Sequence, residues 1–483
     1  MTLDVGSSSV RTLLFDGCGD DQLGFGGQST YHLTTTHDGG AEVDPDALLQ
    51  LCLKCLTTLH GQLATAGVKP AAVAFDTFWH SFLGVDGAGK PTTRILHLFD
   101  TRSTRQSLDL AKRLDASRVH ARTGCRVHPS YWPAKLLWLS QNFPDACAAT
   151  KRWMSFGEYL FLKLFGNPVA STSMVSGSGL WLQAANTYDP EMLDALPVQR
   201  EQLYPETQLD QAQNQLQEPY RTQWPLLHGI PWFPALGDGA CNSLGSGCTT
   251  VNEFALMVGT SGAIRAVVQA ESVKIPDGLW CYRVDPKRYI LGGALSNGGD
   301  VYAWMHQTLQ LPPHEEIERE LRSRQPGSHK LVVLPFFAGE RSPYWRADLR
   351  AALTGMDLST TPVDILHAAL ESVALRFRQI YEMMSTSLGT PLRVIASGGA
   401  LLASPAWAQM MADALGQDIL PCMEREATSR GAALLALERL GAIPCVAGFG
   451  AKLGPPDVAV AERSVLYRQA LAAQAKLFQQ LYT

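Results

Sequence analysis

The sequence predicts an α/β protein built from two related halves. Apolar runs typical of strands alternate with helical runs, and this alternation is the pattern of an α/β architecture. Two loops rich in glycine and serine each follow an apolar strand and lie about 250 residues apart. The length of 483 residues exceeds the size at which one core stops growing, so we expect two domains. The matching loops favour a duplicated fold that holds a polyphosphate from both sides.

The first half opens with two predicted strands, at 3–16 and 23–35. Asp44 and Pro45 then start a helix, because aspartate caps a helix N-terminus and proline fits the first turn. A short apolar strand follows at 73–75. We expect the later helices of this half at 135–140, 145–149 and 156–164.

From about residue 246 the pattern begins again with a strand, a glycine-rich loop and a strand over 254–267. The remaining elements of this half are predicted as a strand at 289–294, a long helix at 361–384, a strand at 393–396, helices at 405–415 and 428–440, a loop at 443–457 and an amphipathic helix at 461–482.

The composition is that of a soluble globular protein, with 46% hydrophobic and 18% charged residues. A formal net charge of −5 gives no electrostatic reason to expect nucleic acid or an anionic membrane as a partner. No apolar run is long enough to span a membrane, and the first strand begins at once, so we expect a cytoplasmic protein without a signal peptide. The short lead before that strand leaves an upstream start open. Cys52 and Cys55 have redox or metal spacing, but without a second pair they are expected as packing residues of the first helix.

The first loop offers a candidate metal and phosphate site. Asp4 ends an apolar strand directly before Gly6, Ser7 and Ser8, and Arg11 follows on the next strand. A carboxylate there can hold hydrated Mg²⁺ beside the phosphates of a nucleotide, and arginine can neutralise phosphate charge. The alternative is an aspartate that starts a turn and hydrogen-bonds its own backbone.

Asp238 is the candidate catalytic base. It ends another strand and has glycine on both sides, which leaves its carboxylate accessible. A carboxylate in this position can accept the proton of a substrate hydroxyl while the oxygen attacks a γ-phosphate. A simple Asp-Gly turn is the alternative.

Two further loops complete the candidate nucleotide site. Gly259 and Thr260 belong to the second glycine-rich loop. Gly398, Gly399 and Ala400 follow a strand and precede a helix, where paired glycines let the backbone pack flat against adenosine; a tight strand-to-helix turn explains them equally well.

Aromatic and polar side chains gather in two segments of the first half. The segment at 78–81 contains Trp79 and His80, and the segment at 128–132 contains Ser130 and Tyr131. Rings, hydroxyls and imidazoles are the groups that recognise a polyol. A structural hydrogen-bonding role for each histidine is the alternative.

The order and content of these motifs resemble the FGGY family of carbohydrate kinases across the whole chain. The most specific match is the segment 351–356 followed by 364–371, which is similar to the C-terminal signature of the family. The resemblance implies an actin-like fold of two ribonuclease-H-like domains with ATP in the cleft between them. It implies an N-terminal domain over 1–245, a C-terminal domain over 246–445, and a final loop and helix over 446–483.

Carried over from the family, each motif has an expected role. Asp4 would be the Mg²⁺-linked carboxylate and Asp238 the catalytic base, which also contacts the substrate. The expected ATP-binding residues are Gly6, Ser7, Ser8, Arg11, Gly259, Thr260, Gly398, Gly399 and Ala400. The expected sugar-binding residues are Trp79, His80, Ser130, Tyr131 and Asp238.

Within the family the sequence looks most like the gluconokinases, which phosphorylate gluconate to 6-phosphogluconate. The pair His80-Ser81 and the segments 100–103, 155–160 and 339–345 resemble theirs. Departures fall in the sugar-facing half: Trp79 replaces a methionine, Leu98 a tryptophan and Trp132 a small residue, and 169–174 lacks an aspartate that many relatives have. These changes are expected to reshape the sugar pocket.

Two other functions stay open at this point. The first is a kinase of the same family that acts on xylulose or another ketose or polyol, because one or two pocket side chains decide the substrate. The second is a non-catalytic, actin-like ATP switch protein. Gluconate would need a cationic partner, for which Arg126 and His128 are candidates. A homodimer through the second domain is the assembly that the resemblance suggests.

Overall fold

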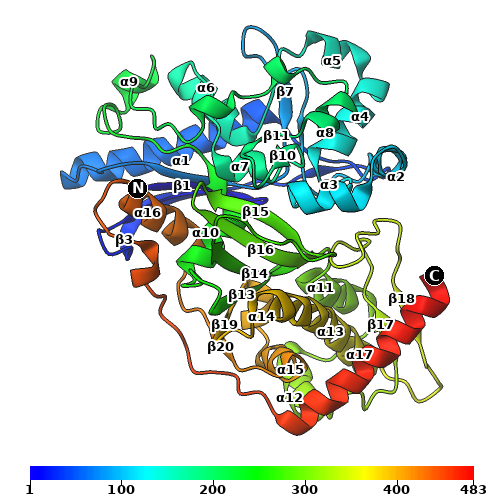
Figure 1. Ribbon diagram of the computed structural model, residues 1–483. Helices are drawn as coiled ribbons and strands as arrows, with labels where there is room; N and C mark the ends of the chain where they lie inside the picture. The colour runs from blue at the N-terminus through cyan, green and yellow to red at the C-terminus, as the bar shows by residue number, and fades with distance from the viewer. Residues whose placement is uncertain (483) are drawn as a thin grey trace.

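The structure, a computed structural model, describes residues 1–482 as two α/β lobes around separate sheets (Figure 1). The five-stranded first sheet has the order β12 (Leu236–Gly237), β6 (Ala74–Thr77), β1 (Thr2–Val5), β2 (Ser9–Phe15) and β3 (Asp21–Thr30). The six-stranded second sheet has the order β15 (Trp280–Asp285), β16 (Arg288–Leu295), β14 (Gly262–Gln269), β13 (Glu253–Val258), β19 (Arg393–Ser397) and β20 (Ile419–Pro421).

The two sheets repeat one topology, which is the duplication that the loops predict. In each, the first strand pairs antiparallel with the second, and the second pairs antiparallel with the third: β1–β2–β3 and β13–β14–β16. On its other side the first strand pairs parallel with β6 or β19, and the edge strand β12 or β20 is again parallel. Because β1 and β13 are central strands, the two glycine-rich loops leave the sheets at equivalent positions.

Helices cover both sheets, and their ends follow the local sequence. The predicted helix at Asp44 is α1 (Pro45–Ala66), where the Asp44 side chain accepts a hydrogen bond from Ala47 N–H and Gly67 ends the helix in the left-handed conformation. Cys52 and Cys55 are buried on its packed face, as expected for packing residues. The other helices of the first lobe are α2 (Thr104–Arg113), α3 (Ala116–Thr123), α4 (Trp132–Asn142), α5 (Pro144–Ala149), α6 (Phe156–Phe165), α7 (Thr172–Ser176), α8 (Pro190–Asp194), α9 (Tyr220–Gln223) and α10 (Asp238–Gly245).

The second lobe has a long central helix, α13 (Pro362–Leu388), which begins with a capping box between Thr361 and Asp364. The other helices of the second half of the chain are α11 (Gly299–Thr308), α12 (His314–Ser323), α14 (Gly399–Leu402), α15 (Pro405–Leu415), α16 (Ala427–Arg439) and α17 (Ala461–Tyr482). Within the described residues 1–482, no helix is long and apolar enough to cross a membrane. The short strands outside the two main sheets are β4 (Thr34–Thr35), β5 (Ala41–Val43), β7 (Leu83–Val85), β8 (Ile95–Leu96), β9 (Arg152–Met154), β10 (Trp181–Leu182), β11 (Thr187–Tyr188), β17 (Val332–Leu334) and β18 (Ala352–Thr354).

Helix α16 connects the two halves of the chain. It comes late in the sequence but packs on α10 and on β1, β2 and β6 of the first sheet (Figure 1). Its Leu434 belongs to the same core as Leu3 and Val5. The crossing with α10 is close, because a Cβ atom on Gly431 would lie 1.9 Å from the carbonyl oxygen of Cys241. Helix α10 begins with Asp238, so α16 supports the element that positions the candidate base.

Candidate active site

The loop between β1 and β2 forms the first phosphate-loop candidate. Gly6 N–H donates to the Ser9 carbonyl at 3.0 Å, and the Tyr31 hydroxyl donates to the Gly6 carbonyl at 2.5 Å. This turn places Ser7 on the wall of a cavity between the lobes and leaves Ser8 exposed. The side chains of Ser7 and Ser8 are therefore open to a ligand between the lobes.

The loop between β13 and β14 is its counterpart. Gly259 N–H donates to the Ser261 carbonyl at 2.9 Å, and the Gly259 carbonyl accepts from Gly299 N–H at 2.7 Å at the start of α11. Thr260 lies exposed at the tip of the loop. A Cβ atom on Gly299 would lie 2.4 Å from that of Ala400, so the second loop and the predicted adenosine motif are neighbours.

A second cavity, of about 680 Å³, extends from the adenosine motif. Gly398 and Gly399 line it together with Arg11 from the first lobe, and the Arg11 guanidinium pairs with Glu426 at 2.8 Å. Gly398 has φ +95°, and a Cβ atom there would lie 2.4 Å from the Val258 carbonyl oxygen, so the turn requires glycine. The structure thus brings the predicted adenosine motif and Arg11 to one cavity.

Buried carboxylates lie beside the first loop. In the strand register Asp4 is opposite Asp76 on β6 and opposite Arg11 on β2. Burial raises the pKa of Asp4 to about 6 against the attraction of Arg11, and burial with the nearby Asp4 raises the pKa of Asp76 well above its usual range. Both carboxylate oxygens of Asp76 lack a hydrogen-bond partner within residues 1–482. Free carboxylate oxygens at a phosphate loop suit a hydrated Mg²⁺ ion, which would also relieve the repulsion between these groups.

Asp238 starts α10 directly after β12, and packing requires glycine at the position before it. A Cβ atom on Gly237 would lie 1.9 Å from Cε2 of Trp79, so the indole ring fills the space that a side chain would take. Gly239 N–H donates to Oδ1 of Asp238 at 2.7 Å. Burial raises the pKa of Asp238, and the nearby Arg265 opposes that rise. Such a carboxylate is a stronger proton acceptor than an exposed one.

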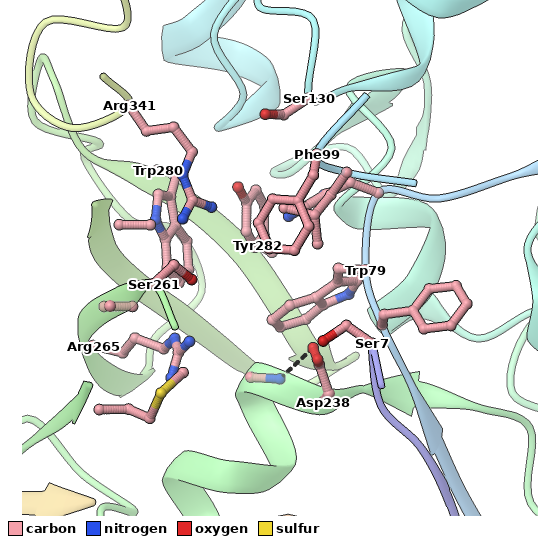
Figure 2. A pocket seen from close by; sticks show the side chains of 18 of the residues that line it. Ser7, Trp79, Phe99, Ser130, Asp238, Ser261, Arg265, Trp280, Tyr282 and Arg341 are labelled. Carbon is pink, nitrogen blue, oxygen red and sulfur yellow. Dashed lines mark hydrogen bonds between the residues drawn. The ribbon is translucent and has the colours of Figure 1, made fainter. Parts of the chain in front are cut away.

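Asp238 lies in a cavity of about 160 Å³ between the lobes (Figure 2). The first lobe contributes all the predicted sugar-binding residues, namely Trp79, His80, Ser130, Tyr131 and Asp238. The second lobe contributes Ser261, Arg265, Trp280, Tyr282 and Arg341. Ser7 and Ser261, one from each glycine-rich loop, line the same cavity as Asp238.

His80 is held as a neutral hydrogen-bond acceptor. Burial lowers its pKa to about 3, so the ring is uncharged at neutral pH. Its Nδ1 lies 2.5 Å from the Gly177 carbonyl oxygen and must donate to it, which leaves Nε2 as an acceptor. Its φ of +65° is uncommon for a residue other than glycine and is typical of functional sites. Nε2 can accept a hydrogen bond from a substrate hydroxyl.

Aromatic side chains join the two walls. Trp79 meets Tyr282 edge to face, with ring centroids 5.2 Å apart, and Tyr282 stacks on Trp280 at 4.5 Å. The hydroxyls of Tyr131 and Tyr282 lie 2.5 Å apart. Of the residues that depart from the family pattern, Trp79 and Leu98 line the cavity. Trp132 instead packs in the core against Phe82, with ring centroids 4.8 Å apart.

The two cations expected to face a substrate carboxylate do not do so. Arg126 pairs with Asp277 and is absent from the residues that line the cavity. His128 packs against Trp345 with ring centroids 5.3 Å apart, and burial lowers its pKa to about 3, so it carries no charge at neutral pH. The cations of the cavity are Arg265 and Arg341 instead.

Sequence reasoning missed these two arginines and Asp76. Arg265 is the one charged residue in the run Ala263–Val268, and a charge within an apolar strand was the available signal. Asp76 is the third residue of β6, as Asp4 is the third residue of β1, so a carboxylate within an apolar strand was the signal there too. Arg341 belongs to the segment 339–345 noted for its resemblance to gluconokinases, but its place in the cavity depends on the tertiary fold.

Comparisons with known proteins agree with this geometry. The model of the N-terminal domain of the FGGY family of carbohydrate kinases matches residues 1–245, and the C-terminal model matches 254–438. A gluconokinase of Bacillus licheniformis is 26% identical over 463 residues, 91% of this chain and 87% of the relative. A xylulose kinase of Staphylococcus xylosus is 23% identical over 438 residues, 90% of this chain and 89% of the relative.

Solved structures show the same fold. A gluconate kinase from Lactobacillus acidophilus superposes with a TM-score of 0.91 at 24% identity, covering 99% of this chain and 97% of that one. A xylulose kinase from the same organism superposes with a TM-score of 0.90 at 24% identity, covering 100% of this chain and 98% of that one. These likenesses confirm the predicted pair of actin-like, ribonuclease-H-like domains. Since the two family models together match most of its length, the chain belongs to the FGGY family of carbohydrate kinases.

Proposed function

We propose that this sugar kinase transfers the γ-phosphoryl group of ATP to the terminal hydroxyl of gluconate, giving 6-phosphogluconate. The observation that carries the proposal is the position of Asp238 in a cavity that also contains Ser7 and Ser261 from the two phosphate-loop candidates. A carboxylate, an acceptor cavity and phosphate-binding loops meet at one place, which is what phosphoryl transfer requires.

In the proposed mechanism the residues of the chain position the reactants and handle one proton. Trp79, His80 and Tyr131 hold the acceptor so that its hydroxyl donates to Asp238. As the hydroxyl oxygen attacks the γ-phosphorus, Asp238 takes the proton and ADP leaves with the bridging oxygen. The loop N–H groups stabilise the charge on the transferred group. Asp4 and Asp76 would hold Mg²⁺, which supplies positive charge beside the phosphates when bound.

Gluconate is supported over the other acceptors by the sequence. The segments 100–103, 155–160 and 339–345 resemble those of gluconokinases, and curated gluconokinases are 25–26% identical to the chain. Xylulose is the second candidate, because xylulose kinases match at 23–24% identity over at least 90% of the chain. A non-catalytic ATP switch is disfavoured, because it needs neither a buried base nor an aromatic cavity beside it.

The experiment is a coupled assay of ADP release with gluconate, xylulose, ribulose, glycerol and erythritol. We expect the largest kcat/KM with gluconate, and the product identified as the 6-phosphate. The variant Asp238→Asn is the matched control for chemistry at this site. Slow hydrolysis that does not depend on any added sugar would overturn the kinase proposal, and preference for xylulose would overturn the choice of gluconate.

A further inference from the structure

Two guanidinium groups of the second lobe face the acceptor cavity. Figure 2 shows Arg265 and Arg341 on one side of it, near Ser261 and Trp280, with Asp238 and Trp79 on the other side. Among the described residues that line the cavity, Asp238 is the single carboxylate. His80 is neutral at pH 7 because burial lowers its pKa to about 3. The cavity therefore holds one more positive charge than negative charge.

Arg265 is buried without a partner. Arg265 is on β14 and is 8% exposed, and within residues 1–482 its guanidinium makes no hydrogen bond and no salt bridge. Its Nη1 atom is shielded from solvent and has no acceptor. Burying a charge in this way costs several kcal/mol unless an opposite charge is supplied. Asp238 attracts Arg265 from nearby, but no nitrogen of Arg265 is within 4.0 Å of a carboxylate oxygen of Asp238, so the N–H donors of Arg265 are free to bind a ligand.

The packing around Arg265 directs its guanidinium to the substrate wall. The side chain passes over Gly292 on β16, where a Cβ atom would lie 3.1 Å from its Cγ. The guanidinium lies against the start of α10, where a Cβ atom on Gly239 would lie 3.3 Å from its Cζ. The ring of Trp79 is next to the same glycine, with Cζ3 at 3.1 Å from that Cβ position. The group is thus held in the wall beside the predicted sugar-binding residues.

Arg341 adds a second cation on the same side. Its guanidinium donates to the Leu295 carbonyl, and this one bond leaves other N–H groups open to the cavity. Burial and the nearby Arg341 lower the pKa of Arg265 to about 10, so both groups stay charged at neutral pH. Two like charges that repel across a small cavity are stabilised by an anion that binds to both.

We propose that Arg265, together with Arg341, binds a carboxylate on the acceptor, which makes sugar acids the substrate class and Arg265 a specificity-determining residue. The inference rests on the proposed kinase function and adds the residues that bind the carboxylate of the substrate. A planar guanidinium presents paired N–H donors that match a carboxylate. The γ-phosphoryl group is the other oxyanion that reaches this cavity, and the test separates the two.

The test compares gluconate with gluconamide, which has the same carbon chain and hydroxyls but no charge. In the wild-type enzyme we expect a higher kcat/KM for gluconate. Arg265→Met should reduce the gluconate-to-gluconamide ratio by about 10²-fold, mainly through gluconate, because a hydrogen bond to a charged group is lost. Arg265→Lys should keep part of the ratio, and KM for ATP should be unchanged in both variants.

Arg126→Met is the matched control, because Arg126 is a nearby arginine that pairs with Asp277 outside the cavity, and its ratio should equal that of the wild type. An unchanged ratio in Arg265→Met, with both substrates slowed equally, would overturn the proposal and assign the arginine to the phosphoryl group. The melting temperature of ligand-free Arg265→Met should change little, because the guanidinium makes no direct hydrogen bond or ion pair that the substitution would break. If that variant does not fold, the gluconate-to-gluconamide ratio of kcat/KM in Arg265→Lys and Arg341→Met tests the proposal instead.

The wild-type enzyme alone separates the two levels of failure. If it phosphorylates gluconate but accepts gluconamide equally well, the assignment of the arginines is wrong and the kinase proposal stands. If it phosphorylates xylulose and leaves gluconate unchanged, the choice of gluconate and the acid-binding role both fail.

Discussion

We expect turnover to depend on Asp238, which lies in the cavity at the start of α10 and whose pKa is raised by burial. Asp238→Asn keeps the shape and removes the proton acceptor. We expect kcat to fall by about 10²- to 10⁴-fold, the usual contribution of a general base. Affinity for ADP, measured by titration calorimetry, should stay within a few-fold of the wild type, because the nucleotide cavity does not contain this residue. A variant with near wild-type kcat would show that another group takes the proton.

At this scale the sequence pointed to candidate residues where a polar side chain or glycine stands at a strand end, and it passed over candidates elsewhere. Asp4, Asp238 and the glycine-rich loops were found because a polar residue or glycine after an apolar strand marks a strand end. Arg126 was chosen for its charge near the 128–132 segment, but Asp277, 151 positions away, neutralises it. Arg265 was passed over because a strand arginine is ordinary until the opposite lobe is known to cover it. Charge pairing across lobes is a tertiary property that local sequence does not report.

Among the elements, the turn between β19 and α14 provides a matched pair of glycines. Gly398 has φ +95° and would place a Cβ atom 2.4 Å from the Val258 carbonyl, whereas a Cβ atom on Gly399 would meet nothing within 4 Å. Gly398→Ala should therefore distort the turn and raise KM for ATP by about tenfold or more, the equivalent of strain of 1–3 kcal/mol. Gly399→Ala is the control and should leave stability nearly unchanged. Equal ATP kinetics in the two variants would contradict this account of the turn.

A buried polar cluster around Glu371 joins helix α17 to α13 through hydrogen bonds. Glu371 accepts from Nε2 of His329 at 2.9 Å and of His367 at 3.0 Å, and from the Tyr467 hydroxyl at 3.2 Å. Glu371, His329 and His367 are a carboxylate and two imidazoles, which is the composition of a metal site. Nδ1 of His329, however, accepts from Leu331 N–H at 2.9 Å, so Nε2 carries the proton and donates to Glu371. The cluster is a hydrogen-bonding network that holds the C-terminal helix.

This network makes stability depend on pH. Burial alone would raise the pKa of Glu371, but the hydrogen bonds from His329 and His367 outweigh burial and lower it from 4.5 to about 2. The carboxylate therefore contributes stability above pH 4.5, and this contribution is lost as the pH falls toward 2. Glu371→Gln should lower the free energy of unfolding by about 3 kcal/mol at pH 7, measured in urea, and the deficit should shrink below pH 4.5. Glu382→Gln, a half-exposed carboxylate on the same helix, should cost about 1 kcal/mol or less.

The helices and strands themselves were largely predictable. Capping residues and apolar periodicity gave the start of α1, and gave α13, α15, α16 and α17 within a few residues of both ends. The order of the strands and the packing of α16 on the first sheet could not be predicted, because both depend on contacts between segments far apart in the sequence.

For the whole molecule, the proposed acceptor cavity has one wall from each lobe, so we expect a bound substrate to contact both lobes. We expect the lobes to move closer when gluconate and a non-hydrolysable ATP analogue bind together, which would exclude water from the site. Small-angle X-ray scattering should record a smaller radius of gyration with both ligands than with neither. Asp238→Asn should close in the same way, because it keeps the binding groups. An unchanged radius in the wild type would indicate a preformed, rigid site.

The position of α16 has a consequence for synthesis on the ribosome. The first sheet is covered in part by Leu434 and Leu435, which are translated more than 400 residues after β1. At ordinary elongation rates of about 5–20 residues per second, the apolar faces of β1 and β6 that α16 covers stay exposed for tens of seconds before α16 is made. The N-terminal lobe of the nascent chain is therefore unfinished until nearly the whole polypeptide has emerged, and during that interval it is a natural client for chaperones that shield exposed apolar surface.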